Sequence, residues 1–206
     1  MTEFTGTIDH DAEHNESGTG FDNTDNQIRM TDSGDNSATR YRGMFIKDNI
    51  TIPQGSTINS AVISGYVYIY DDPNLDIYCE DVDDSDDFTG TADINSRVRT
   101  TASVEWVATN IGTNAYKDSP DFASAVQEVV DRAGFSSGNS IGVIMVPKGT
   151  TNNGFYLRST EYTLPPSITI DYTEPEVGSG GETTSRNSIA LKTCLNLNNF
   201  ITFLEI

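Results

Sequence analysis

The sequence predicts an all-β fold, a jelly-roll-like antiparallel β-sandwich with one short α-helix. Short alternating apolar stretches recur along the chain, and clusters of Gly, Pro, Asn and Asp, the residues typical of turns, separate them. Strand patterns do not alternate with helical patterns, so parallel βαβ units are not expected. Two stacked antiparallel sheets are the simplest way to bury strands of this kind.

The first 40 residues are polar and rich in turn residues, and we expect residues 1–40 to form an N-terminal arm that adds edge strands at 4–8 and 27–30. The sandwich domain is expected to span residues 41–173. It begins with a strand at 41–47, and the turn IPQGST leads from there to the longest strand, residues 58–70.

Three tyrosines share one face of strand 58–70, namely Tyr66, Tyr68 and Tyr70, and small or branched apolar residues occupy the other face. Tyr78 lies on the next strand, 75–80, which the turn DDPN joins to it as a hairpin. Rows of tyrosine fill sandwich interiors and subunit interfaces, and they also serve as platforms for sugar rings. We therefore predict a ligand-binding or interface surface at these four tyrosines, with both kinds of partner open.

The remaining strands are predicted from the same alternation, and Trp106 is expected to pack beneath the sandwich rather than to bind a ligand. These strands are residues 94–99, 103–108, 140–146, 154–159 and 167–172.

Residues 120–133 are the one segment with helical periodicity. Its apolar residues fall on one stripe, at Phe122, Val126, Val129 and Val130. Ser119 is expected to cap the helix, Pro120 to occupy the first helical position, and Gly134 to end it in a left-handed conformation. The helix is then a crossover that covers one end or edge of the sandwich.

After the sandwich, residues 174–188 have the composition of a flexible linker, and residues 189–206 form an apolar tail. The tail packs back on its own domain, docks on a neighbouring subunit, or is a cloning or frame artefact. Cys79 and Cys194 are too few for a disulfide framework or a structural zinc site.

The net charge of −19 argues against binding to a nucleic-acid backbone, which needs clustered Lys and Arg, and it disfavours an anionic membrane surface for the same reason. No apolar run approaches the ~20 residues that span a bilayer, and the first residues lack the pattern of a secretory signal. We expect a protein that binds neither nucleic acid nor membrane.

Catalysis is not expected. The two histidines, His10 and His14, lie in the polar arm, and we expect them to be exposed, which leaves the core without a histidine for a catalytic triad. A glycosidase needs only two carboxylates, but Glu105 beside Trp106 is the one Glu in an apolar context that would raise its pKa. We therefore predict a non-enzymatic protein without an organic cofactor.

The segment DVDDSDD holds the densest group of acids, and Asp81, Asp83 and Asp84 are the candidate ligands of a structural calcium ion. The spacing is not that of an EF-hand, because Asp86 stands where the loop needs Gly and Ala92 where it needs Glu. A solvated acidic loop is the stronger interpretation.

Several motifs occur together in an order that resembles the DNRLRE-type β-sandwich module, which is similar to carbohydrate-binding modules. They are RYRGMFIKDNITIPQGSTINSAVISGYVYIY, TTASVEWV, SPDFASAVQEVVDRAGFSSGNSIGVIMV and PPSITIDY, and they cover about residues 40–173. The resemblance implies a jelly roll, and no binding residue carries over from it.

Modules of this family occur in cell-surface and secreted proteins and in structural proteins of tailed-phage particles. A short module with an N-terminal arm and a C-terminal tail is similar to the second group. The resemblance therefore implies a virion structural protein, such as a capsid decoration or tail-associated subunit assembled in the host cytoplasm, with other virion proteins and further copies of itself as partners. A carbohydrate-binding module that recognises a polysaccharide is the alternative.

Overall fold

The computed structural model describes residues 1–32, 40–69, 72–88, 93–148 and 153–176. Residues 1–175 form one compact unit. Most of the expected linker and all of the apolar tail, as well as Tyr70 and Cys194, lie outside the described residues. Among the described residues, no helix is long and apolar enough to cross a membrane.

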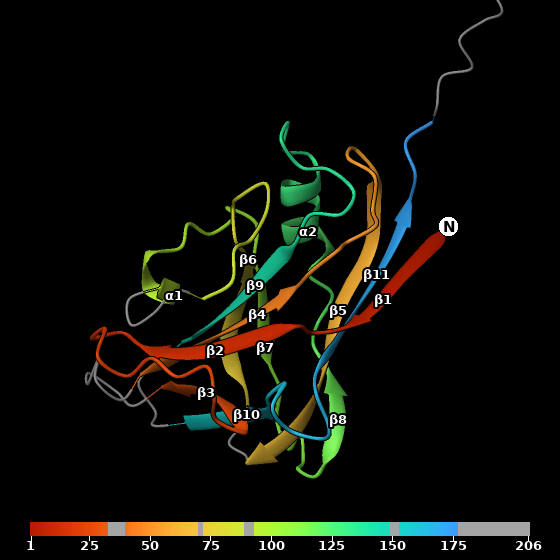
Figure 1. Ribbon diagram of the computed structural model, residues 1–206. Helices are drawn as coiled ribbons and strands as arrows, with labels where there is room; N and C mark the ends of the chain where they lie inside the picture. Colours follow the sequence, from red (N-terminus) through yellow and green to blue (C-terminus); the bar gives the residue numbers. More distant parts are fainter. Residues whose placement is uncertain (33–39, 70–71, 89–92, 149–152, 177–206) are drawn as a thin grey trace, which may run out of the picture. The chain divides into compact units, whose positions relative to one another are not determined.

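Within these ranges the chain forms strands and two short helices, and every strand pair is antiparallel (Figure 1). The predicted all-β class is confirmed. The elements are β1 (Thr2–Thr7), β2 (His10–Asn15), β3 (Gln27–Asp32), β4 (Tyr41–Lys47), β5 (Thr57–Ile69), β6 (Asn74–Cys79), α1 (Asp93–Ser96), β7 (Val104–Val107), β8 (Ala115–Asp118), α2 (Ala123–Val130), β9 (Ile141–Pro147), β10 (Asn153–Arg158) and β11 (Ser167–Thr173).

The strands pair in the order β1-β11-β5-β10-β3-β4-β9-β6-β7, with β2 beside β4 and β8 beside β5. This path is continuous, so the strands form one curled sheet, and a division into two stacked sheets is not confirmed. The shortest strand pairing along this path is that of β3 with β4, in which Thr31 lies opposite Tyr41. The thirteen-residue strand β5 is long enough to pair with β11 along its first part and with β8 and β10 further on.

The main hydrophobic core contains residues from most of the strands and from α2. Phe45, Ile63, Ile77 and Phe155 are among its fully buried members. Trp106 is 3% exposed and contacts Phe155 edge to face at 5.1 Å, so its predicted place in the core is confirmed.

A second, smaller cluster lies on the other face of β4. Met44 and Ile46 of β4 belong to it, whereas Phe45 between them points into the main core. Ile94 of α1 also belongs to this second cluster and is 2% exposed. Since β4 is covered on both faces, its apolar residues run without a break, which is the pattern expected for a strand buried on both sides.

The helix α1 replaces the predicted strand at 94–99. Ile94 is the buried apolar residue of this segment, and one turn of helix is sufficient to place it on the second cluster. The alternation that indicated a strand does not correspond to a buried and an exposed face, because Val98 is 60% exposed.

Helix α2 has the predicted apolar face, but it is shorter than predicted. Val126, Val129 and Val130 are buried. The helix begins at Ala123, with Phe122 as its N-cap and without a side-chain cap, because Ser119 accepts a hydrogen bond from the N–H of Ile63 in β5 instead. The predicted capping role of Ser119 and helical position of Pro120 are therefore wrong.

The role predicted for Gly134 is also wrong, since its backbone is not left-handed. A Cβ at this position would overlap the carboxylate of Asp83, so a larger residue here would displace the side chain that pairs with Arg132.

The first forty residues contribute β1, β2 and β3 to the sheet, and β2 was not predicted from the sequence. Three of its ionisable side chains are buried: Asp11 is 2% exposed, and Glu13 and His14 are 0% exposed. Glu13 accepts hydrogen bonds from the backbone N–H of Arg29 at 2.6 Å and from the Arg29 guanidinium. Glu13 thus accepts one backbone N–H of β3 that a carbonyl of a neighbouring strand would otherwise accept.

Gly43 is required where β3 passes close to β4. A Cβ at this position would lie 2.7 Å from Ile28 and 3.2 Å from Met30, which are both buried. We expect Gly43→Ala to lower the free energy of unfolding by about 1–3 kcal/mol through overpacking. Urea unfolding measures this loss. Ile28→Ala in the same background makes room for the methyl group, so additive losses in the double variant would contradict the explanation.

Candidate functional site

Tyr66 and Tyr68 lie together on the outward face of β5, as predicted. The alternating residues Ile63 and Val67 are fully buried in the core, whereas Tyr68 is 36% exposed. Gly65 lies between Ile63 and Val67 in sequence, and a Cβ at Gly65 would be 2.8 Å from the side chain of Leu157 in β10. The glycine thus allows β10 to pack closely beside β5.

Tyr116 of β8 joins these tyrosines from the neighbouring strand. It is directly opposite Tyr66 in the β5–β8 pair, and the two rings contact edge to face, with centroids 5.5 Å apart and planes at 84°. Tyr116 is 44% exposed, and its hydroxyl donates a hydrogen bond to the carbonyl oxygen of Pro165 at 3.2 Å. The sequence prediction missed Tyr116 because the four-residue strand β8 was not predicted.

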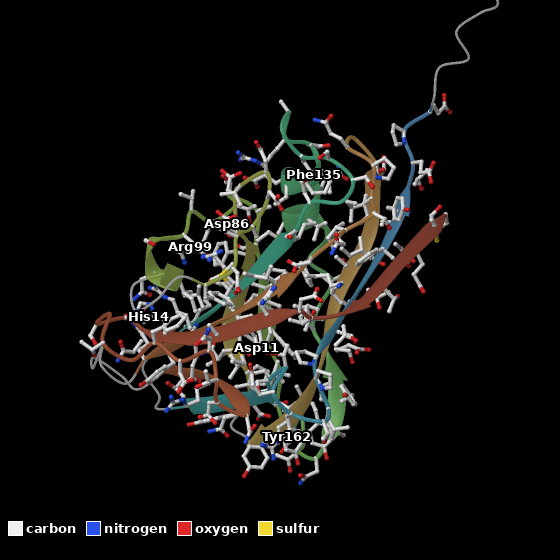
Figure 2. All side chains as sticks on the ribbon, in the orientation of Figure 1. Asp11, His14, Asp86, Arg99, Phe135 and Tyr162 are labelled. Atoms are coloured by element: carbon white, nitrogen blue, oxygen red, sulfur yellow. The ribbon has the colours of Figure 1, made fainter. Side chains whose placement is uncertain are left out.

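Arg158 of β10 lies between two tyrosine rings. Its guanidinium carbon is 3.4 Å from the ring centroid of Tyr68 and 3.9 Å from that of Tyr162. Tyr162 belongs to the segment between β10 and β11, and Figure 2 shows it in the lower part of the view, where β8 and the C-terminal end of β5 lie in Figure 1. Both distances are within the range of cation–π contacts.

Within the described ranges, Arg158 forms no salt bridge with an acidic side chain. Most other arginines in those ranges form a salt bridge, namely Arg29, Arg40, Arg42, Arg97 and Arg132. Among the described residues, Arg158 therefore differs from these arginines in that aromatic rings, rather than carboxylates, contact its guanidinium.

We call this group the tyrosine–arginine surface; its residues are Tyr66, Tyr68, Tyr116, Arg158 and Tyr162. Three strands and one loop supply them. Two of the four tyrosines, Tyr68 and Tyr162, contact Arg158, and the other two, Tyr66 and Tyr116, contact each other. Their ring contacts hold the surface in one arrangement before any partner binds.

Tyr78 does not belong to this surface. It lies on β6, opposite Ile144 of β9, and its ring contacts the guanidinium of Arg99 at 4.9 Å. β6 and β5 are separated by four strands in the sheet order. The fourth predicted tyrosine, Tyr70, lies outside the described residues.

The acidic segment after β6 has protein partners. Asp81 and Asp83 both form ion pairs with Arg132, and Asp84 accepts a hydrogen bond from the backbone N–H of Ser140 at 2.7 Å. In the described part of the chain, no group of three or more His, Cys, Asp and Glu side chains is arranged to hold a metal ion. Calcium binding by Asp81, Asp83 and Asp84 stays a prediction without a ligand group to support it.

The residues considered for catalysis are placed differently from the expectation. Glu105 is not in an apolar context, because it is exposed and accepts a hydrogen bond from Lys148 at 2.6 Å. His14 is fully buried rather than exposed, and its ring contacts Phe21 edge to face at 5.9 Å. His10 lies between two carboxylates, 3.0 Å from Asp48 and 3.3 Å from Asp87.

Burial also changes the acidity of groups in and near β2. Desolvation raises the pKa of Asp11 to about 7, and it raises the pKa of Glu13, which the hydrogen bonds and charge of Arg29 partly offset. Burial likewise raises the pKa of the Cys79 thiol, so this cysteine is an inert core residue rather than a nucleophile.

Comparison with known proteins gives no family assignment. No protein-family model matches the chain, and no curated protein matches it.

Proposed function

We propose that this chain is a non-enzymatic structural protein of a virus particle, a capsid decoration or tail-associated subunit, and that the tyrosine–arginine surface is its contact with a neighbouring copy. The virion setting rests on the motif resemblance to DNRLRE-type modules. The contact role rests on the arrangement of Tyr68, Arg158 and Tyr162, which is the observation that carries the proposal.

The composition of the surface supports a protein–protein contact. Tyr and Arg are enriched among the residues that contribute most to binding at protein interfaces, whereas Lys, Glu and Asp are depleted there. The arrangement of the rings supports the same role. Arg158 covers one face of Tyr68 and one face of Tyr162, and Tyr66 meets Tyr116 edge to face. These contacts occupy part of the ring surface that a stacked sugar would use.

Purified particles test the virion setting. We expect quantitative mass spectrometry of particles from the producing host to find this protein in a fixed ratio to the major capsid protein. Particles that lack the protein would contradict the proposal.

Variants test the contact. We expect the wild-type protein to self-associate in sedimentation equilibrium, and Tyr68→Ser combined with Arg158→Ser to weaken the association at least about 30-fold, as for residues worth about 2 kcal/mol or more. The matched control is Tyr78→Ser with Arg99→Ser, which removes the same kind of ring–arginine contact elsewhere. A wild-type protein that stays monomeric at high concentration, or a control variant that dissociates equally, would argue against this contact.

A polysaccharide is the second candidate partner, because the exposed fractions of Tyr68 and Tyr116, 36% and 44%, leave part of each ring open for stacking. Binding to a panel of neutral and acidic polysaccharides, with and without calcium, measures this directly. If the wild-type protein binds one of them and the Tyr68→Ser, Arg158→Ser variant does not, the surface serves a sugar ligand instead of a second copy.

A further inference from the structure

A polar pocket of about 150 Å³ lies at the start of β2, where four segments of the chain meet. The first two segments are residues 9–11 and Asn23. The third is Asp87 with Phe88, at the end of the acidic segment, and the fourth is Thr160 with Glu161, in the loop before β11. Apart from Phe88, every residue that lines the pocket has a polar or ionisable side chain.

Asp11 is the buried part of this pocket, and Figure 2 shows it near the centre of the molecule. Asp11 is 2% exposed. One carboxylate oxygen, Oδ2, accepts a hydrogen bond from the backbone N–H of Thr160 at 2.6 Å, whereas Oδ1 has no partner among the described residues. A buried carboxylate oxygen without a partner is costly, and it points to a ligand that supplies positive charge.

Three further carboxylates lie at the more exposed part of the pocket: those of Asp9, Asp87 and Glu161. Asp9 accepts hydrogen bonds through Oδ2 from Lys47 and from the backbone of Asp48, and Asp87 contacts His10 through Oδ1. These contacts use one oxygen of each carboxylate, so both side chains keep a second oxygen for another ligand.

We propose that this pocket binds a hard divalent cation of the calcium type, with Asp11 as the buried ligand and Asp9, Asp87 and Glu161 as ligands from the rim. Calcium takes six to eight oxygen ligands in a flexible geometry, and carboxylates, amide oxygens and water supply them. Since the carboxylates are not already arranged as a metal-holding group, binding draws the exposed rim side chains toward Asp11.

The site differs from the calcium site predicted in the acidic segment. Asp81, Asp83 and Asp84 have partners of their own, and none of them lines this pocket. A cation bound at Asp11 links four segments that are far apart in sequence, and one of its ligands, Glu161, directly precedes Tyr162 of the tyrosine–arginine surface. The cation therefore stabilises the fold and the loop that carries Tyr162.

Calcium titration of the chelator-treated full chain at pH 8 tests the proposal. We expect millimolar calcium to raise the Tm of the wild-type protein by at least about 4 °C and to release or absorb heat in calorimetry. Asp11→Asn should abolish both signals, and Glu161→Gln should weaken binding at least tenfold. The matched control Asp84→Asn should behave like the wild type.

Two results would overturn the proposal: no response of the wild-type protein to calcium, or a response that survives Asp11→Asn. A response to zinc at lower concentration than to calcium would also overturn it, because it would indicate a site built on His10 rather than on carboxylates. Asp11→Asn removes an unpaired buried charge, so the variant is expected to fold, and a lost response cannot be attributed to unfolding.

Discussion

Arg29→Met is expected to lower the free energy of unfolding by about 3–5 kcal/mol, the usual cost of removing one partner of a buried ion pair. The variant leaves the carboxylate of Glu13, which is 0% exposed, without the guanidinium that neutralises it. The backbone N–H of residue 29 still donates to Glu13, but one neutral donor does not offset the burial of a charge. Chemical denaturation at pH 7 measures the loss.

The double variant Glu13→Gln, Arg29→Met distinguishes the buried charge from lost packing. It removes both charges and keeps an acceptor for the N–H of residue 29, so it should be more stable than Arg29→Met alone. Arg99→Met serves as a control for the loss of a surface arginine and should cost no more than about 1 kcal/mol. If the double variant is as unstable as Arg29→Met, the unpaired carboxylate is not the cause.

Asp11→Asn is expected to stabilise the protein at pH 8 in the presence of a chelator. Burial raises the pKa of Asp11 from 3.8 to about 7, so the folded state holds the proton more tightly than the unfolded state. The free energy of unfolding therefore falls as the pH rises from about 4 through 7, and a pKa difference of about 3 corresponds to at most about 4 kcal/mol. Asn keeps the acceptor for Thr160 without the charge.

Denaturation curves from pH 4 to pH 8 check this. As the pH rises over this range, the free energy of unfolding of the wild-type protein should fall relative to that of Asp11→Asn. Near pH 4 the pH-dependent difference between the two proteins should vanish. Asp171→Asn is the matched control, since Asp171 is partly exposed and bonded to Ser60 on the neighbouring strand; its effect should stay within about 0.5 kcal/mol. Parallel curves for wild type and Asp11→Asn would show that folding does not raise the pKa of Asp11.

The sequence predicted the face of α2 but not its start. The apolar stripe at Val126, Val129 and Val130 is a local signal that decides which side is buried. Ser119, the predicted cap, accepts a hydrogen bond from the backbone of Ile63 in β5, and Asp121 accepts one from Ala61 in β5 as well as one from Ala123, the first residue of the helix. Local capping preferences were overridden by contacts with a strand distant in sequence.

Strand β2 was missed for a related reason. The segment HDAEHN has no apolar alternation, and the partners that make its burial tolerable, Arg29 and Thr160, are 16 and 149 residues away. No pattern within the segment identifies such partners. Its buried acids and the pocket at Asp11 therefore emerge only from the three-dimensional arrangement.

The candidate surface was predicted in part. Period-2 alternation correctly placed Tyr66 and Tyr68 on one face of β5, because this face is decided within the strand. Tyr116, Arg158 and Tyr162 join them through strand pairing between distant segments, which composition does not reveal. Tyr78 was grouped with them because it follows β5 in sequence, but β6 pairs with β7 and β9 instead.

Hydroxyl-radical footprinting of the tyrosines tests the proposed contact most directly. The oxidation of each tyrosine is compared between the isolated protein at low concentration and purified particles that contain it. The proposed contact requires strong protection of Tyr68, Tyr116 and Tyr162 in the particle, with Tyr78 unchanged. Equal oxidation of those three tyrosines in both samples, or protection confined to Tyr78, would contradict it.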